Sequence, residues 1–308
     1  MLDRTNFRGI FVIVVTPFHD NSALDEAGLE RTMQFCLAAK VHGVVANAIA
    51  SEGGYLDRDE RRRTAEIAVN AVKGKTPAIV AVSAMHWRIA AGYARDAEAV
   101  GADGIMSFPP GLATAAEVKE YYRALSEVTG LPMVLQNWFG PGGNTMSPQL
   151  IAELVDELPT VRFVKEESAY PAQSVGEIIR LCGDKLYGVM GGRGGKTLME
   201  EARHGVSGTM PACEIADVHV ALWNAIEARD ERLSRKIFQR LLPLIDLEGS
   251  YGMAMMKEVL RMRGVTTAVN FRQPGFRRLD HHALSEAALI MDDLADWMLP
   301  TYPHRKAK

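Results

Sequence analysis

Cysteine is scarce in this sequence, and neither sign of charge is in large excess. The three cysteines, Cys36, Cys182 and Cys213, lie far apart and are odd in number. This argues against a disulfide framework and for a reducing cytoplasm. The formal net charge is −3, and no basic helix or stripe stands out. We therefore expect a cytoplasmic protein without a nucleic-acid partner.

Long hydrophobic runs and metal-binding motifs are also missing. The longest apolar run near the start, GIFVIVVTPF, is too short to span a membrane. It also lacks the basic segment and small-residue cleavage site of a signal peptide. No cysteine has a metal-ligand spacing, and the eight histidines form no H-E-x-x-H or similar cluster. We therefore expect no membrane segment, no bound metal and no cofactor.

Short apolar segments alternate with amphipathic ones along the chain. The apolar segments predict eight strands, near residues 9–17, 43–50, 77–84, 103–108, 131–137, 161–166, 186–190 and 206–210. The segments between them predict helices at 25–40, 57–73, 86–100, 115–128, 147–157, 172–182 and 195–203. Eight such units predict an α/β fold, a (β/α)8 TIM barrel, with an open doubly wound sheet as the alternative.

The strand signals stop after residue 212, and the rest of the chain predicts helices at 215–248, 252–262 and 283–298. These exceed the single helix that closes a barrel. We therefore expect the barrel strands and helices within residues 1–215. Residues 216–308 would supply the final barrel helix and a helical C-terminal extension.

The carboxyl ends of the strands are where a barrel of this kind carries its functional residues. The sharpest candidate is Lys165, in the stretch VRFVKEESAY. Burial among apolar residues lowers the pKa of a lysine and yields an amine that can attack a carbonyl carbon. A lysine whose head reaches solvent or pairs with Glu166 is an equally good interpretation of its position alone.

Other strand ends carry further candidates. The stretch GVMGGRGGKT looks like a phosphate loop, but Met190 stands where that loop needs glycine. Gly191 and Gly192 would instead let backbone N–H groups approach a substrate carboxylate, or would only form a tight turn. His86 begins a helix, where capping or packing is the alternative to a functional role.

The order and spacing of several motifs resemble the dihydrodipicolinate synthase and N-acetylneuraminate lyase superfamily. These motifs are GIFVIVVTPF at the first strand, Ser51-Glu52 at the second, LPMVLQN at the fifth and Lys165-Glu166 at the sixth. The resemblance covers nearly the whole chain. It implies a (β/α)8 barrel, usually a homotetramer, in which Lys165 forms a Schiff base with a 2-oxo acid.

The chain departs from the superfamily pattern at several positions. Residues 48–52 read Ala-Ile-Ala-Ser-Glu where the superfamily has Gly-Thr-Thr-Gly-Glu or a close variant. The usual general acid/base, a tyrosine, falls on Gln136. The arginine for a second substrate falls near Pro141, and an aromatic pair is replaced by Pro110-Gly111. Dihydrodipicolinate synthase itself is therefore not expected.

The departures resemble one subgroup, the L-2-keto-3-deoxyarabonate dehydratases. The resemblance rests on Ala48 with Ser51-Glu52, on Gln136, on Lys165 with Glu167, and on LPLIDLEGSYG late in the chain. It implies that Lys165 forms an iminium at C2 and thereby acidifies C3. Loss of the C3 proton and then of the C4 hydroxyl gives dehydration, whereas loss of the C4 hydroxyl proton gives retro-aldol cleavage.

An acid/base group must accompany the lysine in either reaction. Gln136 cannot titrate, so it would only orient a hydroxyl or a water. Side chains alternate along a strand, so Glu167 shares a face with Lys165 and is the catalytic candidate. Alternatively, it faces water or only pairs with the lysine. Glu52 fits better as a structural acceptor for loop N–H groups than as a catalyst.

The predicted substrate-binding residues come from several strand ends. Ser51 and the Gly191-Gly192 backbone would hold the substrate carboxylate, and the remaining candidates are Ala50, Ser83, His86, Asn137 and Thr209. We expect a dehydratase acting on a small 2-keto-3-deoxy sugar acid. The alternatives are a pyruvate-dependent aldolase and a non-catalytic oxo-acid-binding barrel.

Overall fold

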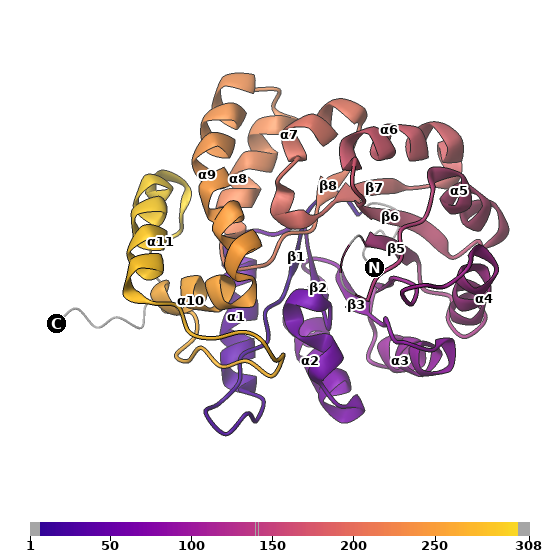
Figure 1. Cartoon of the computed structure of the whole chain (residues 1–308), viewed down its shortest axis with the longest axis horizontal. Helices are drawn as coiled ribbons and strands as arrows, with labels where there is room; N and C mark the ends of the chain where they lie inside the picture. The colour runs from indigo at the N-terminus through magenta and orange to yellow at the C-terminus, as the bar shows by residue number, and fades with distance from the viewer. Residues whose placement is uncertain (1–6, 139, 141, 301–308) are drawn as a thin grey trace.

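Eight parallel strands close into a barrel in the computed structural model, which describes residues 7–138, 140 and 142–300. The strands follow one another around the barrel in sequence order, and β1 pairs with both β2 and β8 (Figure 1). They are β1 (Gly9–Ile13), β2 (Gly43–Ala46), β3 (Ala78–Ala81), β4 (Gly104–Ser107), β5 (Met133–Trp138), β6 (Val161–Glu167), β7 (Gly188–Gly191) and β8 (Gly208–Thr209). The predicted barrel is confirmed, and its closure excludes the open sheet.

An outer ring of helices covers the barrel (Figure 1). It consists of α1 (Glu26–Ala38), α2 (Arg58–Val72), α3 (Trp87–Ala99), α4 (Ala115–Ser126), α5 (Pro148–Glu157), α6 (Pro171–Cys182), α7 (Leu198–Glu201) and α8 (Ala216–Glu227). Thr114 and Ser147 cap α4 and α5, because each side chain accepts a hydrogen bond from a backbone N–H of the first turn. Among the described residues, no helix combines the length and apolarity needed to cross a bilayer.

The predicted single helix over 215–248 is wrong. The structure has two helices there, α8 and then α9 (Glu231–Tyr251). Arg229 adopts a left-handed conformation with φ of 56° after the end of α8. Asp230 then caps α9 by accepting a hydrogen bond from the Leu233 N–H at 2.9 Å. The break turns the chain back, so that α9 packs against α8 instead of prolonging it.

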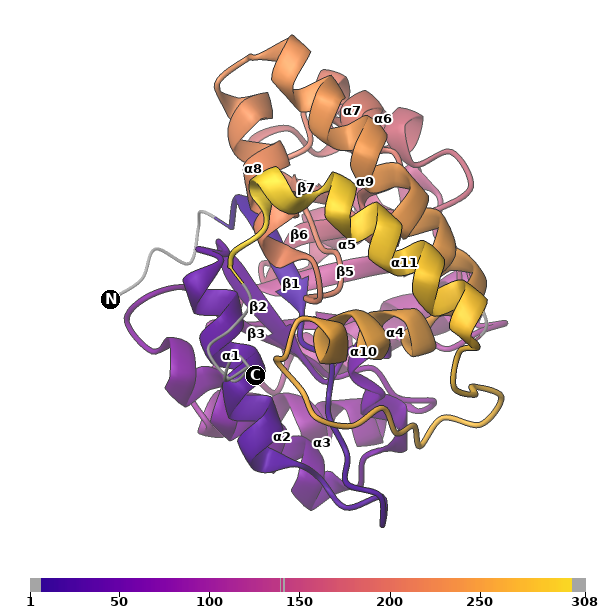
Figure 2. The same ribbon diagram turned by 90° about the vertical axis from the view of Figure 1, so that its left-hand side faces the viewer.

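The C-terminal extension consists of α9, α10 (Met253–Met262) and α11 (His281–Asp293). Figure 2 shows α11 lying across α9, and both α10 and α11 contact that helix. The predicted helix over 283–298 is interrupted after α11 by a short 3-10 turn at Ala295–Trp297. The helical extension is confirmed, whereas the division of the chain at residue 215 stays a prediction.

A separate apolar core fills the inside of the barrel. The side chains that point inward come from seven strands and the segments beside them, and they are Phe7, Phe11, Ile13, Val45, Ala48, Ile79, Ala81, Met106, Val134, Phe163, Met190 and Met210. Phe7 stacks on Phe163 with ring centroids 4.6 Å apart. Phe163 precedes Lys165 by two residues on the same face of β6, so the packed core lies directly below the lysine.

Candidate active site

Lys165 lies near the carboxyl end of β6, on the face that points into the barrel. The strand continues through Glu167, so both side chains are on the inner face, and they are opposite Gln136 and Trp138 of β5. Only 7% of the Lys165 side chain and 3% of the Glu167 side chain are exposed. Lys165 Nζ is 3.1 Å from Glu167 Oε2. The interpretations in which Lys165 is solvated or pairs with Glu166 are therefore wrong.

Glu167 is held in place by donors on both of its carboxylate oxygens. Gln136 Nε2 donates to Oε2 at 2.7 Å, and the backbone N–H of Arg193 donates to Oε1 at 3.0 Å. Gly192 makes this arrangement possible, because a Cβ at that position would overlap the carboxylate. The interpretation in which Glu167 turns into a loop and faces water is wrong. Its predicted catalytic role is compatible with this geometry and stays a prediction.

A cavity of about 580 Å³ lies at this end of the barrel. Strand ends form one part of its lining, with Lys165, Glu167, Gln136 and Trp138. The remaining lining residues come mainly from the turn after β2, the loop after β7, and α9, and include Ile49, Ala50, Arg193, Lys196, Ile245, Asp246, Glu248 and Ser250. The cavity has the size of a small-molecule site and combines an apolar floor with polar groups.

Four of the predicted site residues line this cavity: Lys165, Glu167, Gln136 and Ala50. Ser51 does not. Its hydroxyl donates a hydrogen bond to the Val14 carbonyl at 2.5 Å, so it cannot donate the same proton to a ligand. The prediction that Ser51 holds the substrate carboxylate therefore finds no support in its position.

Asn137 lies on the outer face of β5, because it directly follows the inward-facing Gln136. Its side chain donates to the Met146 carbonyl at 3.1 Å and to Glu166 Oε2 at 2.8 Å. The Ser168 N–H donates to the other Glu166 oxygen at 2.6 Å. Burial raises the pKa of Glu166. Asn137 thus fastens the loop after β5 to β6 instead of lining the cavity.

The other predicted binding residues also lie away from the cavity lining. Ser83 Oγ accepts from the Phe108 N–H at 3.0 Å, and His86 caps α3 by accepting from the Arg88 N–H at 3.1 Å. Gly191 follows the inward-facing Met190, and Thr209 precedes the inward-facing Met210. Both residues therefore face away from the inside of the barrel. Gly192 is not part of the cavity lining, but it leaves room for the Glu167 carboxylate, which is.

Sequence reasoning missed the cavity residues on α9 and in the loop after β7. Ile245, Asp246, Glu248 and Ser250 lie within LPLIDLEGSYG, the stretch that carries part of the family resemblance. Ile245 and Glu248 are three residues apart, and Asp246 and Ser250 are four apart, so each pair lies on one side of a helix, which is a usable signal. The packing of α9 against the barrel mouth, however, is a tertiary feature that local periodicity does not predict.

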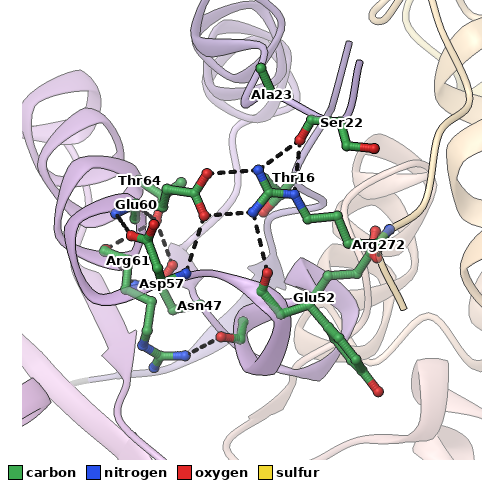
Figure 3. A network of polar contacts seen from close by, with 12 residues as sticks. Thr16, Ser22, Ala23, Asn47, Glu52, Asp57, Glu60, Arg61, Thr64 and Arg272 are labelled. Atoms are coloured by element: carbon green, nitrogen blue, oxygen red, sulfur yellow. Dashed lines mark hydrogen bonds and ion pairs between the residues drawn. The ribbon is translucent and has the colours of Figure 1, made fainter. Parts of the chain in front are cut away.

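Glu52 anchors the turn after β2 to the C-terminal extension. Its Oε2 accepts from the backbone N–H groups of Arg272 and Gln273, both at 2.7 Å, and its Oε1 is 2.5 Å from Lys257 Nζ on α10. Figure 3 shows Arg272 beside Glu52, with its guanidinium reaching Glu60 and Ser22. The predicted structural role of Glu52 as an acceptor for loop N–H groups is confirmed. This network positions Ile49 and Ala50 at the cavity.

We expect Lys257→Met to lower the free energy of unfolding by about 3–5 kcal/mol, because it leaves the Glu52 carboxylate buried without its cation. The Lys257 and Glu52 side chains are 3% and 0% exposed. Urea denaturation measures the change. The control is Lys185→Met, which breaks an ion pair whose side chains are 63% and 59% exposed and should cost less than about 1 kcal/mol. Equal losses would contradict a structural role for the buried pair.

No group of three or more histidine, cysteine, aspartate and glutamate side chains in the described ranges is arranged to hold a metal ion. The three cysteines are buried and unpaired by disulfides.

The chain is similar to several curated proteins over most of its length. An uncharacterized DapA-like lyase of Rhizobium meliloti is 30% identical over 292 residues, with 93% of this chain and 94% of that protein covered. The L-2-keto-3-deoxyarabonate dehydratase of Azospirillum brasilense is 29% identical over 275 residues, covering 87% and 88%. A 4-hydroxy-tetrahydrodipicolinate synthase of Thermodesulfovibrio yellowstonii is 30% identical over 241 residues, covering 77% and 81%.

Solved structures share the fold. The dihydrodipicolinate synthase of Rhodopseudomonas palustris superimposes with a TM-score of 0.87 at 26% identity, covering 95% of this chain and 99% of the other. The model of the dihydrodipicolinate synthetase family matches residues 6–291. With a match over almost the whole sequence, the chain belongs to the dihydrodipicolinate synthetase family, a family of lyases.

Proposed function

We propose that the protein is a Schiff-base-forming dehydratase that removes the C4 hydroxyl of a 2-keto-3-deoxy sugar acid. One observation carries this proposal. The Lys165 amine and the Glu167 carboxylate lie 3.1 Å apart on the inner face of β6, nearly buried, at the cavity. An amine beside a proton acceptor, in a site large enough for a sugar acid, is what imine chemistry at a ketone requires.

The proposed reaction begins when Glu167 accepts a proton from Lys165, which leaves a neutral amine to attack the C2 ketone. Glu167 returns this proton to the hydroxyl of the carbinolamine, which leaves as water, and the resulting iminium draws electrons from C3. Glu167 then takes the C3 proton. Gln136 holds the carboxylate through its 2.7 Å hydrogen bond and does not itself titrate. Ile49 and Ala50 would border the substrate carboxylate, because they line the cavity from the turn after β2.

Two observations favour dehydration of a sugar acid over other reactions of the family. The dehydratase of Azospirillum brasilense resembles this chain over 87% of its length. The cavity also carries hydrogen-bonding groups suited to a hydroxylated chain, on Arg193, Lys196, Asp246 and Ser250. A pyruvate-dependent aldolase is the second candidate, because 4-hydroxy-tetrahydrodipicolinate synthases are also similar to the chain and Lys165 would serve both reactions.

A substrate screen tests the proposal. The protein is incubated with pentose- and hexose-derived 2-keto-3-deoxy acids, and each mixture is assayed for loss of substrate and for pyruvate. We expect one substrate to lose water without releasing pyruvate. Stoichiometric pyruvate would instead identify the aldolase, and binding without turnover would identify an oxo-acid-binding barrel. Borohydride trapping with mass spectrometry should place the adduct on the Lys165 peptide, and turnover without any adduct would contradict the Schiff base.

The proposal includes a cytoplasmic location and a homotetramer. Free, buried cysteines suit a reducing compartment. Sedimentation measures the oligomeric state directly, and a monomer would contradict the tetramer.

A further inference from the structure

Two buried carboxyl groups meet at one side of the cavity. Glu248 projects from α9 and lines the cavity, although only 5% of the residue is exposed. Glu214 lies between β8 and α8 and is fully buried. Within the described part of the chain, no N–H or O–H group donates to either Glu214 oxygen or to Glu248 Oε1. The Glu214 carboxyl group is near enough to Glu248 to repel a negative charge on it.

No cation of the described residues forms an ion pair with either carboxyl group, which sets them apart from the paired Glu167 and Glu52. Two adjacent carboxylates cannot both be ionised in such a site, so at least one retains its proton. Burial and then the repulsion from Glu214 raise the pKa of Glu248 well above its usual range. Burial without a cation or a hydrogen-bond donor on Oε1 thus favours the neutral form of Glu248.

The charged and titratable groups near this pair have other partners. Arg263 donates to the backbone carbonyl of Glu214 at 2.9 Å, but its ion pair is with Asp217. Burial lowers the pKa of His219 on α8, so its ring is neutral and bonded to the carbonyls of Gly194 and Ile215. Lys196 is engaged with Asp246 at 3.1 Å. The remaining charged groups of the cavity lining are Arg193, Lys165 and Glu167.

A short segment after β7 brings Glu248 close to Glu167. The backbone N–H of Arg193 donates to Glu167 Oε1 at 3.0 Å. The next residue is Gly194, where a Cβ would come within 3.5 Å of Glu248 Oε2. Both residues have positive φ, 52° and 68°, which turns the chain sharply between the two carboxyl groups. Two carboxyl groups, one beside Lys165 and one without a cation partner among the described residues, thus border the same cavity.

We propose that Glu248, a buried carboxyl group that lines the cavity and has no cation partner among the described residues, is the catalytic acid that protonates the departing C4 hydroxyl. This inference rests on the proposed dehydratase function. Glu167 removes the C3 proton, and the C3–H electrons form the C2=C3 bond of an enamine. The nitrogen lone pair then re-forms the C2=N bond, the C2=C3 pair becomes the C3=C4 bond, and the C4–O bond breaks. The Glu248 proton joins the departing oxygen to give water, and solvent later reprotonates Glu248 and deprotonates Glu167.

The reaction needs such an acid because hydroxide is a poor leaving group. Water is a far weaker acid than any carboxylic acid, so even a carboxylic acid with a raised pKa transfers its proton to hydroxide downhill. Gln136 cannot supply that proton, and Glu167 is occupied as the base. The two proton transfers are divided between Glu167, which lies beside Lys165, and Glu248, which has no cation partner among the described residues.

The test compares Glu248→Gln with the unaltered protein in the full chain. We expect borohydride trapping on Lys165 and exchange of the pyruvate methyl hydrogens in D₂O to change by less than about threefold, because both need only Lys165 and Glu167. Dehydration should fall by about 10²–10⁴-fold. A substrate with fluorine in place of the C4 hydroxyl should restore elimination, because fluoride leaves without an acid.

Glu201→Gln is the matched control. Glu201 is another buried carboxyl group with an unpartnered oxygen, and burial raises its pKa to about 7, yet it lies outside the cavity lining. Its dehydration rate should match that of the unaltered protein. Equal losses of fluoride and hydroxyl elimination in Glu248→Gln would overturn the acid role. A missing Lys165 adduct in the unaltered protein would instead contradict the proposed function itself.

The unaltered protein provides a second measurement that does not depend on the folding of a variant. Hydroxyl elimination should decline at high pH as Glu248 loses its proton, whereas fluoride elimination should not show that decline. In Glu214→Gln the amide can donate to Glu248 and favour its ionised form, so the decline should move to lower pH. Identical pH profiles for the two leaving groups would overturn the proposal.

Discussion

Turnover should fall by at least about 10⁴-fold in Lys165→Arg, because a guanidinium stays protonated and cannot form an imine. The positive charge beside Glu167 is retained, so the Glu167 carboxylate still has a cation as its neighbour. Steady-state kinetics on the substrate identified by the screen measures the loss. Borohydride should label the unaltered protein and leave the variant unlabelled.

Lys185→Arg is the control for this first prediction. Lys185 lies on the surface, with 63% of its side chain exposed and its ammonium 2.7 Å from Asp156, and it does not line the cavity. Its substitution should leave turnover within about twofold of the unaltered protein. Retention of more than a hundredth of the activity in Lys165→Arg would contradict an imine mechanism. Thermal melting of both variants separates a chemical effect from unfolding.

The barrel was predictable because its strands repeat one simple signal. A strand covered on both faces is apolar at almost every position, and eight such runs separated by helices leave few alternatives to a closed barrel. The inward direction of Glu167 was predictable for the same reason, because it follows Lys165 by two residues. The same rule, applied to Asn137 after Gln136, indicates the outer face where the structure places Asn137.

The parts that sequence reasoning missed depend on contacts between distant segments. Ser51 is separated from Val14 by 37 positions, yet its hydroxyl donates a hydrogen bond to the Val14 carbonyl. Glu248 reaches the cavity only because the chain reverses at Arg229 and returns as α9. Neither the reversal nor the docking of α9 follows from a local periodic pattern, since amphipathic helices on any side of a barrel look alike.

Glu167→Gln carries the second large effect and tests the proton transfer at C3. We expect turnover to fall by about 10²–10⁴-fold, because an amide cannot accept the C3 proton. The exchange of pyruvate methyl hydrogens in D₂O should fall by a similar factor, whereas a trapped adduct on Lys165 should remain detectable. Proton NMR measures the exchange, and mass spectrometry measures the adduct.

The adjacent residue supplies a matched control for that prediction. Glu166→Gln removes a carboxyl group that is also buried, but that group faces away from the cavity, toward Asn137 and Ser168. Exchange should therefore persist in Glu166→Gln and be lost in Glu167→Gln. Loss of exchange in both variants would show that a buried carboxyl group matters here only for structure. Near-normal turnover in Glu167→Gln would show that another group is the base. Because Glu167 accepts hydrogen bonds from Gln136 and Arg193 and contacts Lys165, the expected contrast depends on which face of β6 each carboxyl group occupies.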